Sequence, residues 1–320
     1  MKSEIGHATE RVLAQVAKRI GPIVVAIIVC QSLLAAAEQP TKKAAKRRAS
    51  DNKPLQFEGA RAEVFKTLGD TKLTLHIFEP EGHTTKDQRP AAVFFFGGGW
   101  NGGSPKQFEP HCRYLASRGM VAITAEYRVK SRHGTSPFEC VKDGKSAVRW
   151  VRANASQLGI DPNRIAAGGG SAGGHVAAAT GNVSGLEEDG EDSKVSSKPN
   201  ALLLFNPVYD NGPSGYGHDR VKDRYEEISP MHNIREGAPP TIVFLGTEDK
   251  LIPVETAKNY EQKMRSVGSR CDTIFYDGQP HGFFNKGRNE DKYYVETVQA
   301  MDEFLISLGW LTGKPTIAPQ

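Results

Sequence analysis

The sequence has few cysteines, and none of them is spaced like the ligands of a metal site. Of the four cysteines in 320 residues, Cys30 lies in an N-terminal apolar stretch, and the others are Cys112, Cys140 and Cys271. No CxxC pair occurs, so a structural zinc site is not indicated. An odd number of remaining cysteines allows at most one intramolecular disulfide, and a chain of this length does not need one. We therefore expect buried free thiols, with a single disulfide as the alternative.

An excess of positive charge is absent from most of the chain, although the formal net charge is +4. Residues 1–48 hold nine Lys and Arg and three Glu, which leaves 32 basic and 34 acidic residues for the rest. A nucleic-acid-binding domain needs a basic cluster on its folded surface, so we expect no nucleic-acid partner. Residues 38–54, with the basic run Lys42–Arg48, are predicted to be a disordered linker. Tethering to a surface is the alternative for this run.

The N-terminal apolar run is too short for a typical transmembrane helix. Ile23–Cys30 falls well below the roughly 20 apolar residues that a membrane span requires. Lys18 and Arg19 precede it, and Ala35–Ala37 follows with small residues suited to cleavage. We expect residues 1–37 to be a signal peptide and the mature protein to be secreted or periplasmic. An uncleaved membrane anchor is the alternative.

From residue 55 the apolar pattern alternates between strands and helices. The predicted strands are Glu63–Leu68, Leu73–Pro80, Ala91–Phe96, Met120–Arg128, Arg164–Gly168, Ala201–Val208, Thr241–Gly246 and Thr273–Tyr276. The predicted helices are Lys106–Arg118, Phe138–Leu158, His175–Thr180, Val254–Ser266 and Tyr293–Leu308. This order indicates an α/β fold over residues 55–310, with an eight-stranded, mostly parallel sheet and helices on both faces. Residues 311–320 are expected to be a flexible tail.

Two polar stretches interrupt this alternation. Residues 184–200 are acidic and rich in serine, which predicts a surface loop. Tyr209–Pro240 is long, charged and aromatic, and it lies between two predicted strands. A connection of this length is suited to cover a site as a cap.

The strongest chemical signal is the run Gly169-Gly170-Ser171-Ala172-Gly173. It stands directly after a predicted strand and directly before a predicted helix, as a nucleophile turn requires. Glycine-rich turns in this position also bind phosphates, but this run has no GK[ST] ending and no acidic residue about 20 positions later at a strand end. We therefore predict that Ser171 is a nucleophile at the N-terminus of a helix.

A serine hydroxyl needs a neighbouring base to become a good nucleophile. His281 follows the last predicted strand, in a loop where Gly278 and Gly282 give the backbone freedom to aim an imidazole. His175, four residues after Ser171, is the alternative. Its place on a predicted helix is more typical of a packed residue, so His281 is our candidate base.

The base in turn needs a carboxylate that fixes its tautomer. Asp249 follows the predicted strand Thr241–Gly246 and is the candidate acid. Glu248 is the alternative, because a shift of one residue changes the direction of the side chain. Stabilising an oxyanion also needs preset N–H donors. These are expected from Ala172 and from the loop Gly97–Trp100, where glycines allow the backbone to approach a substrate.

Taken together, these residues resemble the α/β-hydrolase superfamily, most closely its hormone-sensitive-lipase-like and acetyl-xylan-esterase-like carboxylesterases. The resemblance extends from about Leu55 to Trp310. It rests on the segments 96–100, 126–128, 161–165, 169–175, 246–253 and 281–284. The order Ser171, Asp249, His281 is also the order of nucleophile, acid and base in this superfamily.

The resemblance implies that Gly98, Gly99 and Ala172 form the oxyanion hole and that no metal or cofactor is needed. One departure is Phe96, which stands where the lipase-like branch has a histidine before the three glycines. This change keeps the backbone donors and removes a polar anchor for the loop. It moves the sequence toward secreted esterases that act on acylated polysaccharides.

We therefore expect a secreted serine carboxylesterase for short acyl groups, with acetyl or feruloyl esters of polysaccharides among its candidate substrates. A peptidase or amidase of the same fold and a non-catalytic binding module are the alternatives. Four aromatic residues are candidates to line a sugar-binding cleft, although such residues also serve as core: Trp100, Tyr127, Tyr209 and Tyr216. Acyl length, alcohol and oligomeric state do not follow from the sequence.

Overall fold

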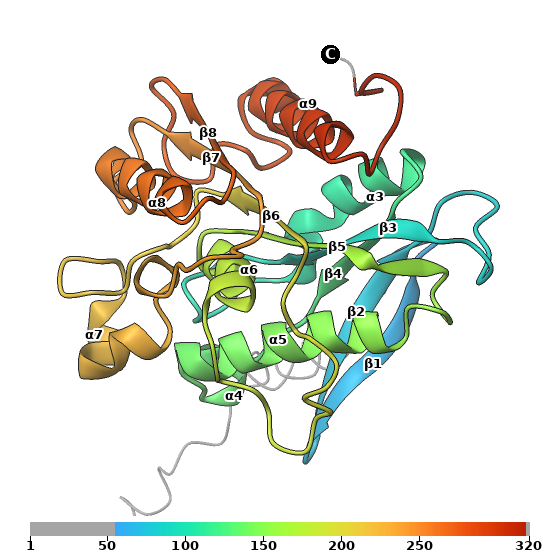
Figure 1. Cartoon of the computed structure of the whole chain (residues 1–320), viewed down its shortest axis with the longest axis horizontal. Coiled ribbons are helices and arrows are strands. Elements are labelled where there is room, and N and C mark those ends of the chain that lie inside the picture. Colours follow the sequence, from blue (N-terminus) through green and yellow to red (C-terminus); the bar gives the residue numbers. More distant parts are fainter. Residues whose placement is uncertain (1–54, 318–320) are drawn as a thin grey trace, which may run out of the picture. The chain divides into compact units, whose positions relative to one another are not determined.

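A single eight-stranded sheet organises the part of the chain that the computed structural model describes, residues 55–317. Its strands are β1 (Arg61–Leu68), β2 (Thr71–Phe78), β3 (Arg89–Phe95), β4 (Val121–Ala125), β5 (Ile160–Gly170), β6 (Ala201–Phe205), β7 (Thr241–Gly246) and β8 (Cys271–Tyr276). Their spatial order is β1-β2-β4-β3-β5-β6-β7-β8 (Figure 1). Only β1 and β2 introduce antiparallel pairs. The predicted mostly parallel sheet of eight strands is thus confirmed.

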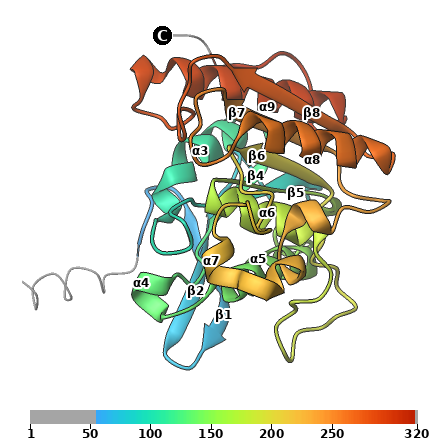
Figure 2. The same ribbon diagram turned by 90° about the vertical axis from the view of Figure 1, so that its left-hand side faces the viewer.

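Helices cover both faces of the sheet. They are α3 (Glu109–Ser117), α4 (Lys130–His133), α5 (Pro137–Ala153), α6 (Ala172–Asn182), α7 (His218–Val221), α8 (Val254–Ser266) and α9 (Lys292–Ser307), with 3-10 turns η1 (Pro105–Phe108), η2 (Lys222–Glu227), η3 (Pro230–His232) and η4 (Asn289–Asp291). α3 and α9 lie on one face, and α5, α6 and α8 lie on the other (Figures 1 and 2). The α/β fold predicted from the alternation is therefore confirmed.

The centre of the sheet is formed by β3, which lies between β4 and β5. Six of its seven residues are buried, as expected for a strand covered on both faces. β5 pairs with it so that Gly168 stands opposite Phe94. A Cβ at Gly168 would lie 2.6 Å from the Phe94 ring, so this position must be glycine for the strands to pack. The close packing brings the end of β5 to the edge where β3 also ends.

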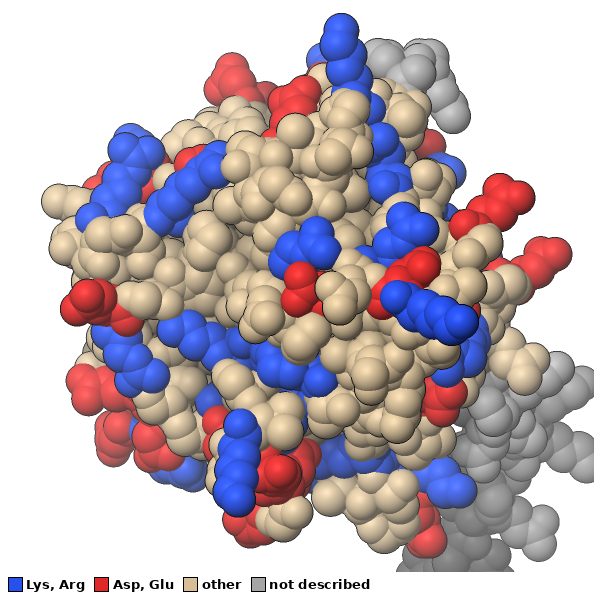
Figure 3. Space-filling model, turned by 45° about the vertical axis from the view of Figure 1, so that its right-hand side comes forward, with Lys and Arg blue, Asp and Glu red and all other residues tan. Residues whose placement is uncertain are grey.

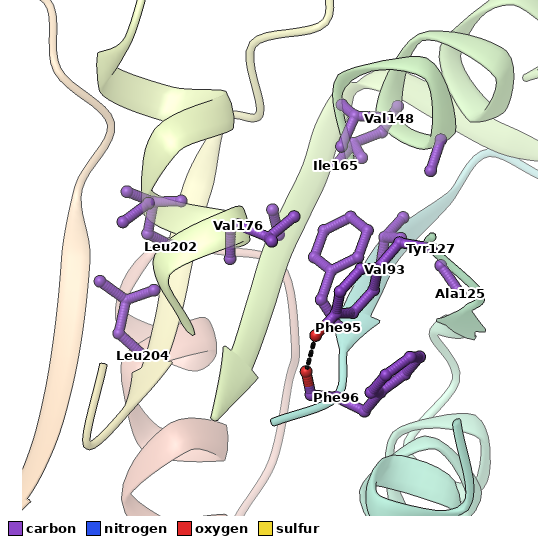
Figure 4. Close-up of a cluster of buried hydrophobic side chains, with 14 of the residues drawn as sticks. Val93, Phe95, Phe96, Ala125, Tyr127, Val148, Ile165, Val176, Leu202 and Leu204 are labelled. Carbon is purple, nitrogen blue, oxygen red and sulfur yellow. Dashed lines mark hydrogen bonds between the residues drawn. The ribbon is translucent and has the colours of Figure 1, made fainter. Parts of the chain in front are cut away.

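The core beside β3 contains side chains from the sheet and from α5 and α6 (Figure 4). Val93 and Phe95 of β3 pack with Val148 of α5 and Val176 of α6, and all four are fully buried. This cluster joins the central strands to two helices. The glycine loop follows the end of β3, and Ser171 follows the end of β5.

Several predicted segments differ from the observed ones in extent; the helix expected over Phe138–Leu158, for example, ends at Ala153, and the strand expected over Ala201–Val208 ends at Phe205. Two others have a local cause. The strand expected over Met120–Arg128 ends at Ala125, because Arg128 turns to bond Asp143 of α5 through Nε and Nη2, each at 2.8 Å. The helix expected from Lys106 begins with the 3-10 turn η1 and becomes α-helical at Glu109. In both places a local contact, rather than the apolar pattern, sets the boundary.

Residues 311–317, part of the expected flexible tail, contact α3. Leu311 is buried, the Arg118 guanidinium donates to the Thr312 carbonyl at 3.0 Å, and the Thr316 amide donates to the Tyr114 hydroxyl at 3.2 Å. The expected signal peptide and linker lie outside the described residues. Among residues 55–317 we find no helix with the length and apolarity of a membrane span.

The predicted surface loop at 184–200 is tied to α5 by ion pairs. Lys145 donates to Glu187 at 2.8 Å, and Arg149 pairs with Glu187 and Glu191. Figure 3 shows one face of the molecule, on which acidic and basic side chains are interspersed. Glu187 and Glu191 therefore serve the fold by pairing with cations of one helix, while Glu188 of the same loop pairs with Lys66 and Arg128.

Candidate active site

Ser171 occupies the sharp turn between the end of β5 and the start of α6. Its backbone lies at φ 55° and ψ −120°, a conformation that is costly for a residue with a Cβ. The neighbouring glycines make the turn possible. A Cβ on Gly169 would lie 2.5 Å from backbone atoms of Gly173, and one on Gly173 would lie 2.0 Å from the Phe95 carbonyl oxygen. The spacing of glycines around Ser171 is thus required sterically.

The serine lies in a cavity of about 470 Å³ at the carboxyl edge of the parallel strands. Gly97–Gly99 form one wall, and His281 and Leu251 also line it. Within residues 55–317, the amides of Gly98, Gly99 and Ala172 donate to no protein acceptor. Ala172 opens helix α6, whose N-terminus carries partial positive charge. This side of the cavity is therefore suited to bind an oxygen that carries negative charge.

His281 lies beside a buried carboxylate. Its Nδ1 is 2.6 Å from Oδ2 of Asp249, whose side chain is fully buried. The other oxygen, Oδ1, accepts hydrogen bonds from the amides of Leu251 at 2.8 Å and Ile252 at 3.0 Å. A carboxylate held in this way accepts the Nδ1 proton, which leaves a lone pair on Nε2 of the neutral ring. The alternative acid, Glu248, is exposed to solvent.

The sequence-based reasoning missed Asn206, the first residue after β6. Its Oδ1 accepts the Gly282 amide at 2.8 Å, and its Nδ2 lies 3.5 Å from Nε2 of His281. Its φ of 34° is one that asparagine tolerates better than most residues. The only signal for it in the sequence was its position after a strand that ends at the same edge of the sheet.

Three of the four aromatic residues expected to line a sugar-binding cleft lie in the core, so this expectation is wrong for them. Trp100 is 1% exposed, and Tyr127 and Tyr209 are fully buried. Tyr127 stacks on the Phe96 ring with centroids 4.2 Å apart, and its hydroxyl donates to the Phe96 carbonyl at 2.6 Å (Figure 4). Tyr216 does line the cavity. The sequence alone does not distinguish aromatic residues of the core from those that line a cavity, since aromatic side chains occur in both places.

His175, the alternative base, is fully buried and does not line the cavity. Its Nδ1 accepts from Nε1 of Trp100 at 3.3 Å, and Nε2 lies 3.1 Å from the Ile228 carbonyl oxygen. Burial lowers the pKa of His175 from 6.5 to about 4, so the ring is neutral at pH 7. It joins the glycine loop to the connection between β6 and β7.

Part of that connection, Tyr209–Pro240, lies against the glycine loop. Arg220 of α7 donates to the Gly99 carbonyl, and its guanidinium lies 5.5 Å from the Trp100 ring centre. Tyr216 lies 5.8 Å from the same guanidinium. The connection therefore packs against the glycine loop at α7, and its role as a cap stays a prediction.

Two further sequence-based expectations concern metals and thiols. Among the residues described, no group of three or more His, Cys, Asp or Glu is arranged to hold a metal ion. Cys112, Cys140 and Cys271 are free and buried, and burial raises the pKa of the Cys112 thiol.

Two family models match the chain, one after the other. The BD-FAE family matches residues 75–210, which include β3, β4, β5 and the Ser171 turn. The Dienelactone hydrolase family matches residues 214–307, which include Asp249 and His281. Ser171 thus lies in the segment that matches the first family, and Asp249 and His281 lie in the segment that matches the second.

Several curated proteins are similar in sequence. Esterase LipC of Mycobacterium tuberculosis is 30% identical over 215 residues, which cover 61% of this chain and 53% of that protein. An acetylxylan esterase of Xylanibacter ruminicola is 27% identical over 250 residues, which cover 72% of this chain and 47% of that protein. The chain spans about half the length of these two curated relatives.

Among solved structures, esterase 2 of Thermogutta terrifontis is similar over almost its whole length. The form phosphoramylated by tabun superposes with a TM-score of 0.79 and 46% identity, covering 82% of this chain and 99% of that chain. The propionate-bound form gives a TM-score of 0.77 and 45% identity, covering 80% and 97%.

Proposed function

The chain belongs to the α/β-hydrolase superfamily, with carboxylesterases as its relatives, and we propose on this basis that it hydrolyses short-chain acyl esters with Ser171 as nucleophile. The observation that carries the proposal is the hydrogen bond of 2.6 Å between Asp249 and His281. His281 lines the same cavity as a serine held on a strained turn, and Asp249 lies buried behind it. A serine, an imidazole and a buried carboxylate are the groups that acyl transfer requires.

In the proposed first step, Ser171 Oγ attacks the ester carbonyl carbon while Nε2 of His281 takes the hydroxyl proton. Asp249 stabilises the imidazolium that forms, through its hydrogen bond to Nδ1. Collapse of the tetrahedral intermediate breaks the carbon–oxygen bond to the alcohol, and His281 gives its proton to that oxygen. An acyl group is then left on Ser171.

In the second step, His281 removes a proton from water, and the resulting hydroxide attacks the acyl carbon. The same proton returns to Ser171 Oγ as the carboxylic acid leaves. In both steps the carbonyl oxygen becomes negatively charged, and the amides of Gly98, Gly99 and Ala172 are the proposed donors to it. Loss of one such donor typically costs about 3–4 kcal/mol of transition-state stabilisation.

Short acyl chains are favoured by the size and lining of the cavity. Its volume of about 470 Å³ has to hold both the acyl and the alcohol part of a substrate, and Leu251 and Phe284 give it an apolar portion. Esterase 2 of T. terrifontis has been solved with propionate and with butyrate bound. The similar acetylxylan esterase supports acetyl groups on a polysaccharide as a candidate substrate.

We also propose secretion, which rests on the sequence of residues 1–37 and is tested by N-terminal sequencing of the exported protein.

An activity series tests the proposed function. The protein is assayed with p-nitrophenyl esters from acetate to decanoate, with acetylated xylan and with a peptide p-nitroanilide. We expect the highest kcat/KM on acetate to butyrate esters and no cleavage of the anilide. Cleavage of the anilide with no ester turnover would favour the peptidase alternative, and the absence of any turnover would refute the proposal.

A further inference from the structure

Besides the contact of Arg220 with the Gly99 carbonyl and the turn that follows, the glycine loop is held at the peptide group that joins Phe96 to Gly97. Its carbonyl oxygen accepts the Tyr127 hydroxyl at 2.6 Å, and its N–H donates to Oε1 of Gln107 at 2.6 Å. The residues Gly97–Gly99 have no Cβ, so their backbone gains conformational freedom when such a contact is lost. Phe96 has no polar side chain with which to anchor the loop. Gln107 and Tyr127 therefore supply the polar contacts that fix this peptide.

The other end of the Gln107 side chain reaches the loop that carries the base. Its Nε2 donates to Oδ1 of Asn285 at 2.9 Å, and Asn285 Nδ2 donates to the Gly282 carbonyl at 2.8 Å. Gly282 directly follows His281. One chain of hydrogen bonds thus joins the two loops that flank Ser171.

We propose that Gln107 is a positioning residue that holds the amides of Gly98 and Gly99 in place relative to Ser171. This inference rests on the proposed function. Gln107 lines the cavity between the glycine loop and β5: a Cβ on Gly97 would lie 3.5 Å from its Oε1, and a Cβ on Gly170 would lie 3.5 Å from its Nε2. Oxyanion donors act mainly in the transition state and must be preset. Gln107 therefore supports kcat more than substrate binding.

The substitution Gln107→Met tests the proposal, because methionine keeps the length of the side chain and removes both hydrogen bonds. With p-nitrophenyl butyrate we expect kcat to fall about 10- to 100-fold while KM changes by less than about threefold. Lys106→Gln is the matched control, since Lys106 lies on the same turn η1, is exposed and does not line the cavity. Thermal unfolding of both variants is measured alongside.

Asn285→Ala, alone and combined with Gln107→Met, tests whether the two residues act as one chain. We expect the kcat of the double variant to lie no more than about threefold below that of the less active single variant. The reason is that the effects of two residues in one network do not multiply. If Gln107→Met proves unstable, Asn285→Ala carries the same comparison of kcat and KM.

The inference is overturned if Gln107→Met keeps kcat within about twofold of the wild type, or if KM rises while kcat stays unchanged. It is also overturned if the losses of the two single variants multiply. Ser171→Ala separates this failure from that of the proposed function. An inactive Ser171→Ala beside a fully active Gln107→Met refutes only the role of Gln107, whereas an active Ser171→Ala refutes the proposed function itself.

Discussion

At the scale of single residues, the proposed chemistry depends on where a few side chains are held. Ser171 stays in a positive-φ conformation because the packed ends of β3 and β5 and the glycines around it allow no other path. Asp249 is buried, and both of its carboxylate oxygens accept hydrogen bonds. Oδ1 accepts from two backbone amides, which leaves Oδ2 to bind Nδ1 of His281. Both arrangements place a reactive group at the edge of the sheet before any substrate binds.

The roles of Asp249 and Glu248 predict unequal effects of removing their charges. We expect Asp249→Asn to lower kcat roughly ten-thousand-fold, since an amide favours the wrong imidazole tautomer. Glu248→Gln is the matched control, and we expect its kcat to stay within about threefold of the wild type because the side chain is exposed. Steady-state kinetics on one short-chain ester measures both. A severe loss in Glu248→Gln with a mild one in Asp249→Asn would exchange their roles.

These residues also show which parts of the site a sequence can reveal. The Ser171 turn was predictable, because its steric demands fall on residues adjacent in the chain. Gln107 and Asn285 are 178 residues apart, and their contact leaves no local pattern. The burial of Trp100 and Tyr127 was likewise hidden, since it depends on packing between distant segments.

At the scale of elements, helix α3 carries a buried histidine without polar partners. His111 is fully buried among aromatic rings, including Phe205 and Tyr294, and neither ring nitrogen has a hydrogen-bond partner among the described residues. Burial lowers the pKa of His111 from 6.5 to about 3. An unsatisfied buried polar group of this kind reduces the stability of the helix packing.

This environment predicts that His111→Phe stabilises the protein. Between pH 6.5 and about 3 the unfolded state binds a proton at His111 that the folded state excludes, so the free energy of unfolding falls as the pH falls through this range. We expect the variant to be more stable by about 1–3 kcal/mol at pH 7 and to lose less stability on acidification. Urea unfolding at pH 7 and pH 5 measures both effects. Lower stability at pH 7 with an unchanged pH dependence would contradict the prediction.

At the scale of the whole molecule, the number of strands and their mostly parallel arrangement were predictable from the alternation of apolar runs. The spatial order β1-β2-β4-β3-β5-β6-β7-β8 was not, because periodicity reveals elements but not their neighbours. The order matters for function, since it places β5, β6, β7 and β8 side by side. The residues that follow these four strands, Ser171, Asn206, Asp249 and His281, thereby come to one edge of the sheet.

Covalent labelling of Ser171 tests the proposed function most directly. The folded protein is treated with paraoxon, and the modified residue is located by peptide mass spectrometry while ester hydrolysis is followed in parallel. We expect one diethylphosphoryl group on Ser171, loss of activity in proportion to labelling, and neither labelling nor activity in Ser171→Ala. Ester hydrolysis that persists in Ser171→Ala, or inactivation by labelling at another residue, would contradict the assignment of Ser171 as the nucleophile.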